Sequence, residues 1–227
     1  MFYKKILIIT AFLLSLNYNT FANAEIVAPS NDEIQNWWKQ HSEEKMTIHG
    51  APVLIGLRSK EKAFLVPVYF MERGRNDIDH TILVRPAIKA VREVVDPVRR
   101  DSVAHDLNHD GISEVETSAL GSGQGTTQGA KSIVQFDGWK PIVLHQMEFN
   151  DNLGCCAPPP GGCGQCVSKE VNWKFVDLDG DGNDDLLEEI VIKKGPLENK
   201  LKSRTTTYRY LFKNNAFIRI KDNDKPK

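Results

Sequence analysis

The feature that most limits the fold of this chain is a pattern that occurs twice in its second half. Each copy begins with a short acidic loop containing glycine, continues into a run typical of a β-strand, and ends in two further runs joined by a turn. The first copy begins at Asp106 and the second at Asp177. The middle loop is about eight residues longer in the second copy, and loop length varies most freely between related units. We therefore expect a duplicated β unit.

Runs of β-branched and aromatic residues extend this β character into the first half of the chain. Within the two copies, Asp137-Gly138 and Asn214-Asn215 lie between apolar runs, and these residues tolerate the positive φ of tight hairpins. The glycine-rich segment 121–129 lacks the lysine of a phosphate-binding loop and is expected to be a flexible surface loop. The strand-like runs of the first half are residues 52–57, 63–70 and 81–84.

Two short segments outside these runs predict helices. Ser30 and Glu33 have the S-x-x-E form of a capping box, and apolar residues follow at spacings of three and four. A second helix is expected from Pro86 to Val95, because proline suits the first helical position and Pro97 would end it. The chain is therefore predicted to be mainly β, with antiparallel sheets, the duplicated unit and one or two short N-terminal helices.

The first 24 residues have the three parts of a secretory signal peptide. Lys4 and Lys5 precede an apolar run, and Ala22-Asn23-Ala24 offers a small-x-small cleavage site. The run has about half of the ~20 residues that a spanning helix needs, so we expect no stable membrane insertion after processing. Cleavage after Ala24 would remove two lysines and no acid, leaving 27 of the 29 basic residues and all 30 acidic ones. This slightly negative balance gives no sign of nucleic-acid binding. We expect a periplasmic or secreted protein.

All four cysteines fall between Cys155 and Cys166, in a segment rich in proline and glycine. In an exported chain this spacing predicts two disulfides. A bridge between the adjacent Cys155 and Cys156 would strain the peptide bond, which leaves a nested and a crossed pairing open. Two alternatives are a metal held by four thiolates and a redox motif at Cys163-Gly-Gln-Cys166.

The second acidic loop has the full D-x-D-x-D-G-x5-E pattern of a calcium loop. Calcium prefers about six to eight oxygen ligands, and a loop with carboxylates or amides at positions 1, 3 and 5 and a carbonyl at position 7 wraps the ion in one turn. Without an ion, these like charges would repel one another. The expected ligands are Asp177, Asp179, Asp181, the carbonyl of Asn183, Asp185 at position 9 and Glu188 at position 12.

The first acidic loop has the same form, but Thr117 stands at position 12. Because it offers fewer carboxylates, we expect it to be the weaker of two calcium sites. His105 and His109 have a spacing that suits zinc on a helix, whereas the residues between them suit calcium. The expected calcium ligands are Asp106, Asn108, Asp110, the carbonyl of Ile112 and Glu114.

These loops resemble those of EF-hands and the calcium loops of integrin-type FG-GAP repeats. An EF-hand needs a helix on each side, whereas 171–176 and 186–192 are typical of strands, and an acid at position 9 in both loops suits the FG-GAP pattern. The resemblance implies a local β–loop–β geometry with the ligand roles given above. The resemblance covers each loop and the strand that follows it. The chain departs from the FG-GAP family in two ways: neither copy has a clear Phe-Gly…Gly-Ala-Pro signature, and two units are too few to close a β-propeller.

The motifs favour binding over catalysis. The chain lacks the common serine-hydrolase, zinc-protease and phosphate-loop strings. We expect a non-catalytic binding or structural module of the cell envelope, with calcium fixing its loops and an unidentified protein or glycan as partner. The alternative is an exported hydrolase with structural calcium, in which Glu116 or Glu189 would serve in acid–base work.

The same features divide the chain into five parts, and the sequence leaves open whether the second part is a separate domain. The two calcium-loop units are expected to flank a cysteine-rich insertion. The parts are a signal peptide (1–24), an N-terminal α+β region (25–100), the first calcium-loop β unit (101–150), a Cys/Pro/Gly-rich insertion (151–170) and the second calcium-loop β unit (171–227).

Overall fold

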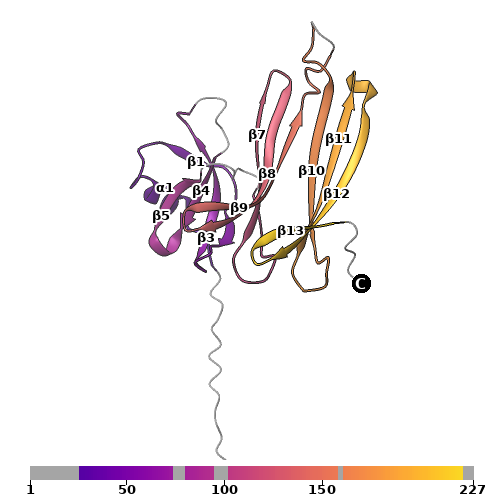
Figure 1. Cartoon of the computed structure of the whole chain (residues 1–227). Helices are drawn as coiled ribbons and strands as arrows, with labels where there is room; N and C mark the ends of the chain where they lie inside the picture. Colours follow the sequence, from indigo (N-terminus) through magenta and orange to yellow (C-terminus); the bar gives the residue numbers. More distant parts are fainter. Residues whose placement is uncertain (1–25, 74–79, 95–101, 158–160, 222–227) are drawn as a thin grey trace, which may run out of the picture.

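The computed structural model describes residues 26–73, 80–94, 102–157 and 161–221. The expected signal peptide lies outside the described residues. The described parts form one α-helix and two antiparallel sheets, which confirms the prediction of a mainly β protein (Figure 1). No helix in these ranges is long and apolar enough to span a membrane.

The smaller sheet has five strands and carries the helix on one face. Its strands are arranged in the order β1-β3-β4-β5, with β2 also paired to β3. The capping box is present, since the Ser30 hydroxyl accepts the Glu33 N–H at 3.3 Å and the Ser30 N–H donates to Glu33 Oε2 at 2.9 Å. The elements are α1 (Asn31–Trp38), β1 (Met46–Ile48), β2 (Val53–Gly56), β3 (Lys62–Phe70), β4 (His80–Arg85) and β5 (Ala90–Val94).

The smaller sheet is buried on both faces, which explains its nearly continuous apolar strands. On one face, Phe64, Val66 and Phe70 of β3 pack with Ile34 and Trp38 of α1. Ala63 and Leu65 of β3 face the larger sheet instead, because side chains point to opposite sides of a strand in turn.

The helix expected from Pro86 to Val95 is wrong. A 3-10 turn (Pro86–Ile88) is followed by Lys89 in the left-handed region, at φ 49°, and the chain then returns as strand β5. Val84 of β4 lies opposite Val91 of β5, and both side chains are fully buried. Pairing with β4 therefore determines the structure of this segment, in agreement with its β-branched residues.

The larger sheet is an eight-stranded meander in which each strand pairs with the next along the chain. A two-residue turn at Asn214 and Asn215, with φ of 54° and 58°, confirms the second expected hairpin. Segment 121–129 is a tight hairpin instead of a flexible loop, because Gly123 pairs with Thr126 and the ladder continues from there. The strands are β6 (Val103–His105), β7 (Glu114–Gly123), β8 (Thr126–Asp137), β9 (Lys140–Asp151), β10 (Cys166–Val176), β11 (Asp185–Gly195), β12 (Lys202–Lys213) and β13 (Ala216–Ile220).

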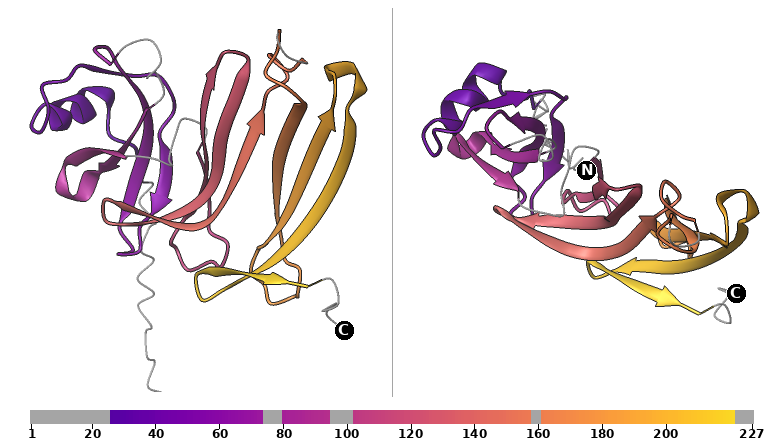
Figure 2. Two further views of the ribbon diagram at one scale, coloured as in Figure 1. Left: turned by 45° about the horizontal axis from the view of Figure 1, so that its top comes forward. Right: turned by 90° about the horizontal axis from the view of Figure 1, so that it is seen from above.

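The two sheets share a core. Leu57, Leu65 and Leu83 of the smaller sheet region pack with Val134 and Phe136 of β8. Figure 2 shows the smaller sheet and its helix beside one end of the larger, curved sheet. The N-terminal part therefore shares buried apolar surface with the rest of the chain, which stabilises the two sheets together.

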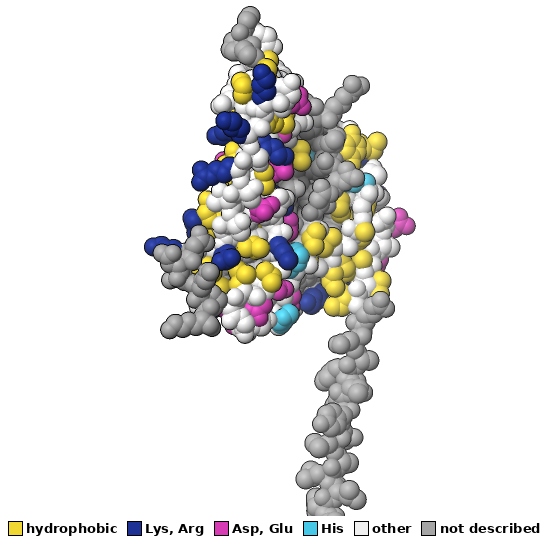
Figure 3. Space-filling model, turned by 90° about the vertical axis from the view of Figure 1, so that its right-hand side faces the viewer, with side chains coloured by type: hydrophobic (Ala, Val, Ile, Leu, Met, Phe, Trp, Pro, Cys, Tyr) yellow, Lys and Arg dark blue, Asp and Glu magenta, His cyan; other side chains and the backbone are white. Residues whose placement is uncertain are grey.

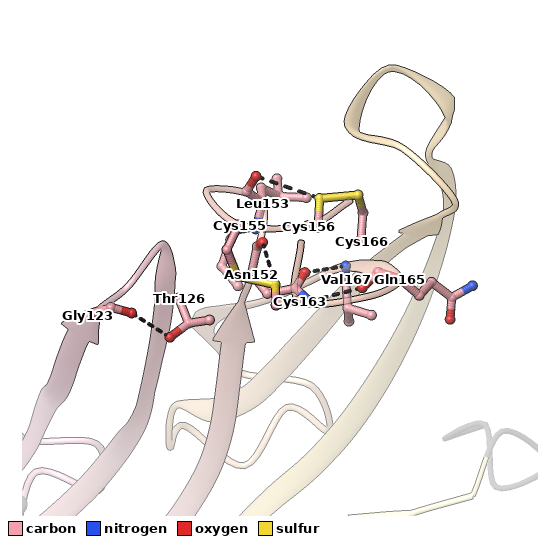
Figure 4. Close-up of a disulfide and its surroundings, with 11 residues drawn as sticks. Gly123, Thr126, Asn152, Leu153, Cys155, Cys156, Cys163, Gln165, Cys166 and Val167 are labelled. Carbon is pink, nitrogen blue, oxygen red and sulfur yellow. Dashed lines mark hydrogen bonds between the residues drawn. A yellow bond between two sulfur atoms is a disulfide. The ribbon is translucent and has the colours of Figure 1, made fainter. Parts of the chain in front are cut away.

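The cysteine segment connects β9 to β10 and contains two disulfides, Cys155–Cys163 and Cys156–Cys166 (Figure 4). Of the two pairings that the sequence leaves open, the structure has the crossed one. The Asn152 amide supports the segment, since it donates to the Gln165 carbonyl at 2.9 Å and accepts the Val167 N–H at 2.7 Å. Such disulfides are typical of an oxidising, extracellular environment.

Candidate metal centre

The second acidic loop joins β10 to β11 and brings three of its expected ligands together. Asp177, Asp179 and Asp185 each offer a carboxylate oxygen, and these oxygens lie within 4.8 Å of one another. Gly180 and Gly182 make the tight turn possible with φ of 79° and 87°. This acidic cluster can hold a metal ion.

The first acidic loop joins β6 to β7 and repeats the hydrogen bonds of the second. The position-6 N–H donates to the position-1 carboxylate, from Gly111 to Asp106 at 3.0 Å and from Gly182 to Asp177 at 3.1 Å. The position-7 N–H donates to the position-5 carboxylate, at 2.7 Å in the first loop and 2.8 Å in the second. The position-2 N–H donates to the position-9 carboxylate at 2.9 Å in both loops. The two loops therefore have closely similar conformations, although duplication of the whole unit stays a prediction.

The acid at position 9 is fully buried in both loops. Glu114 accepts the Gln135 side-chain N–H at 2.6 Å, and Asp185 accepts the backbone N–H of Phe212 at 2.7 Å. Burial raises the pKa of both carboxyl groups despite these hydrogen bonds, and the other loop acids raise it further. A bound cation would offset both effects, because it stabilises the charged carboxylates.

Glu188, the expected position-12 ligand, lies outside the loop. Side chains alternate along β11, so Glu188 points to the face opposite Asp185. Its fully buried carboxylate accepts from His145 Nε2 at 2.8 Å, Trp173 Nε1 at 3.0 Å and the Tyr210 hydroxyl at 3.3 Å. This placement corrects our expectation for Glu188, whose three partners come from β9, β10 and β12.

The two acidic loops contact each other directly. The Asp184 N–H of the second loop donates to the Leu107 carbonyl of the first at 2.7 Å. The turn between β12 and β13 contacts both, since Lys213 Nζ lies 2.8 Å from Asp179 Oδ2 and Asn215 Oδ1 accepts from Asn108 at 3.4 Å. The loops thus form one acidic region at one end of the larger sheet.

The first loop also contacts the smaller sheet. Ser113 exchanges two hydrogen bonds of 2.9 Å with the backbone of Gly56 in β2. A Cβ atom at Gly56 would lie 1.9 Å from the Gly111 carbonyl oxygen, so glycine is required for this close approach. Lys60 and Lys62 donate to the carbonyls of Asp110 and Gly111. The sequence carries no local signal for these contacts, because the lysines are distant from the loop along the chain.

The other candidate groups do not form a comparable site. Among the described residues, the side chains that come close enough to share a metal ion are the three aspartates of the second loop, and no histidine is among them. The His105 ring packs against the Phe175 ring in a tilted arrangement with centroids 4.4 Å apart, and burial lowers the pKa of His105. Glu116 forms an ion pair with Lys131 at 3.1 Å, while Glu189 is exposed. These positions give the zinc and acid–base alternatives no support.

Comparison with known protein families, with curated proteins and with solved structures finds no match for this chain. The resemblance of the loops to FG-GAP repeats therefore stays a prediction. The chain's own geometry supports a metal site, above all through the matching conformations of the two loops and the buried acid in each.

Proposed function

We propose that the protein is an exported, non-catalytic module of the cell envelope in which two calcium ions fix the junction between its sheets. The contact between the loops carries this proposal, because Asp184 of one loop donates to Leu107 of the other and Ser113 joins the first loop to Gly56. Ions in the loops would therefore stabilise the region where three parts of the chain meet. The disulfides support a periplasmic or secreted location, where a protein or glycan of the envelope would be the partner.

The donor atoms favour calcium because all of them are oxygens, which hard cations prefer. The second loop offers four carboxylates and the first offers three with one amide, so the second is the stronger proposed site. Glu188 is not part of either set. The proposed ligands are Asp177, Asp179, Asp181, Asp185 and the Asn183 carbonyl in the second loop, and Asp106, Asn108, Asp110, Glu114 and the Ile112 carbonyl in the first.

Calorimetric titration with calcium tests the proposal by its stoichiometry. The wild-type protein is expected to bind two ions, and Asp177→Ala and Asp106→Ala are each expected to bind one. Asp177→Ala should retain the weaker site and Asp106→Ala the stronger one. Glu189→Ala removes an exposed acid of β11 outside the loops and serves as the control with two ions. Absence of calcium binding by the wild type at millimolar concentration would refute the proposal.

Lys213 is expected to compete with calcium for the second loop. Its Nζ lies 2.8 Å from Asp179 Oδ2 and 4.0 Å from Asp181 Oδ2, and its hydrogen bond lowers the pKa of Asp179. Lys213→Met should therefore tighten calcium binding at this loop by a few-fold, as measured by the same titration. Lys193→Met, which removes an ion pair with Glu170 outside the loops, is the matched control. Weaker binding by Lys213→Met would contradict the competition.

A further inference from the structure

Part of β12 forms a free edge of the larger sheet. Strand β13 pairs only with Arg209–Lys213, so residues 202–208 have no partner strand on that side among the residues that the structure describes. Figure 1 shows β12 rising at the side of the sheet beyond its short contact with β13. An unpaired edge exposes backbone N–H and C=O groups that another extended chain can pair with.

The register of the hairpin identifies which backbone groups are free. Lys213 and Ala216 flank the two-residue turn, so the backbone groups of Lys213 point towards β13. Because the direction alternates along a strand, the odd-numbered residues of β12 point away from β11. The Phe212 N–H agrees with this assignment, since it donates to Asp185 at the start of β11. The N–H and C=O groups of Ser203, Thr205 and Thr207 therefore point away from β11, on the side where the described residues supply no pairing strand.

The same edge is strongly basic. Residues 193–221 contain nine lysines and arginines and one acid, although the whole chain has a formal net charge of −1. Figure 3 views the molecule from the side of β12 and shows Lys and Arg side chains gathered along one margin. The positive charge is therefore concentrated at this end of the sheet, which favours an acidic partner.

The placement of these cations lowers the stability of the folded protein when no partner is bound. Lys194 and Lys202 lie directly opposite each other on β11 and β12, and like charges in this position destabilise a sheet. Arg204, opposite Ile192, lies on the same face as Lys202 because the two are two residues apart. Lysines on edge strands prevent pairing with a second copy of the same strand, but they do not prevent pairing with an acidic one.

We propose that the free edge of β12, from Lys202 to Tyr208, docks an extended acidic segment of a partner protein as an additional strand. The outward N–H and C=O groups of Thr205 and its odd-numbered neighbours would pair with the backbone of the segment. Its acidic side chains would lie beside Lys202 and Arg204 and remove the unfavourable charge arrangement. This surface is separate from the acidic loops and does not depend on calcium.

A fluorescent synthetic peptide tests the docking. The probe has about eight residues with glutamate at alternate positions and valine or threonine between them, the spacing that one face of a strand requires. Fluorescence anisotropy should show saturable binding that weakens with salt, and a peptide with lysine in place of glutamate should not bind. Lys202→Glu with Arg204→Glu should abolish binding of the acidic peptide, whereas Lys169→Glu, on β10, should preserve it.

Proline at the edge separates strand pairing from attraction between charges. Thr205→Pro removes an outward N–H without changing the charge, and Thr205→Val keeps that N–H. Thr205→Pro should weaken peptide binding by about tenfold, since it removes a backbone hydrogen bond and obstructs the pairing, while Thr205→Val should not. A peptide with N-methyl groups at alternate backbone positions should lose binding to the wild-type protein, which tests the pairing even if Thr205→Pro does not fold.

Four results would overturn the proposal. They are failure of the wild type to bind the acidic peptide, equal binding of the peptide with and without N-methyl groups, self-association of the protein through this edge, and peptide binding that requires removal of residues 222–227. Equal binding of the two peptides would show that the surface recognises charge alone, as in polyanions or anionic membranes. The third and fourth would assign the edge to a second copy or to the chain's own C-terminal segment.

Discussion

Glu188→Ala is expected to lower the free energy of unfolding by roughly 3–5 kcal/mol, the usual effect of removing one partner from a buried charged network. The substitution leaves His145 Nε2, Trp173 Nε1 and the Tyr210 hydroxyl without their shared acceptor. For a chain of this size the melting temperature should fall by about 10 °C. Thermal unfolding followed by circular dichroism measures the effect, and the exposed neighbour Glu189→Ala should remain within about 0.5 kcal/mol of wild type. Equal losses for both variants would contradict this role of Glu188.

The same network predicts a pH dependence of stability. Burial acts to raise the pKa of Glu188, but hydrogen bonds from His145, Trp173 and Tyr210 together outweigh it and hold the pKa below 4.5. A lowered pKa in the folded state stabilises the protein above pH 4.5, and this contribution is lost as the pH falls through the folded-state pKa. Glu188→Gln should therefore reduce the loss of stability in acid. Urea unfolding of the wild type and of Glu188→Gln above and below pH 4.5 measures this difference. An equal loss of stability in acid for both proteins would contradict a lowered pKa of Glu188 in the folded state.

Calcium is expected to raise the melting temperature by about 5–10 °C for each site at a free concentration of roughly 100 times that site's dissociation constant, where one site contributes about 2.7 kcal/mol. The ion would bind the folded loops and have little affinity for the unfolded chain. Asp177→Ala combined with Asp181→Ala should remove the part of this rise that the second loop contributes. Asp137→Ala combined with Glu189→Ala removes the same charge from exposed positions outside both loops and should keep the full rise. Loss of the rise in that control would show a general charge effect.

The strands were predictable where local pattern and tertiary packing agree. Residues 63–70 predict a strand from their β-branched and aromatic composition, and strand β3 covers them because both of its faces are buried. Residues 86–95 were mispredicted because proline at the start is a local helix signal, whereas pairing with β4 is a long-range contact. The hairpin in segment 121–129 was missed for a similar reason. Its glycines suggest a loop, yet Gly129 is needed because a Cβ atom there would lie 2.3 Å from the backbone carbonyl oxygen of Ala119 in β7 and 2.5 Å from the Phe149 ring.

The acidic loops were predictable because their expected ligands follow one another within a few residues. Their conformations depend on local glycines and carboxylates, as the matching hydrogen bonds to Asp106 and Asp177 show. Glu188 was misplaced because the position-12 rule assumes that the chain leaves the loop as a helix. In a strand, residues three apart point to opposite faces, so the side chain leaves the loop. The contacts of Lys213 and Gly56 come from distant segments, and no local pattern indicates them.

The hydrogen bond from Asp184 to Leu107 has a consequence for how the two loops would respond to ions. An ion that ordered one loop would also restrain the backbone of the other, so the binding of a second ion would cost less conformational entropy. Such coupling would be reciprocal, and each ion would raise the affinity for the other by the same factor. Positive cooperativity of this kind would confine the change from relaxed to rigid protein to a narrow range of calcium concentration.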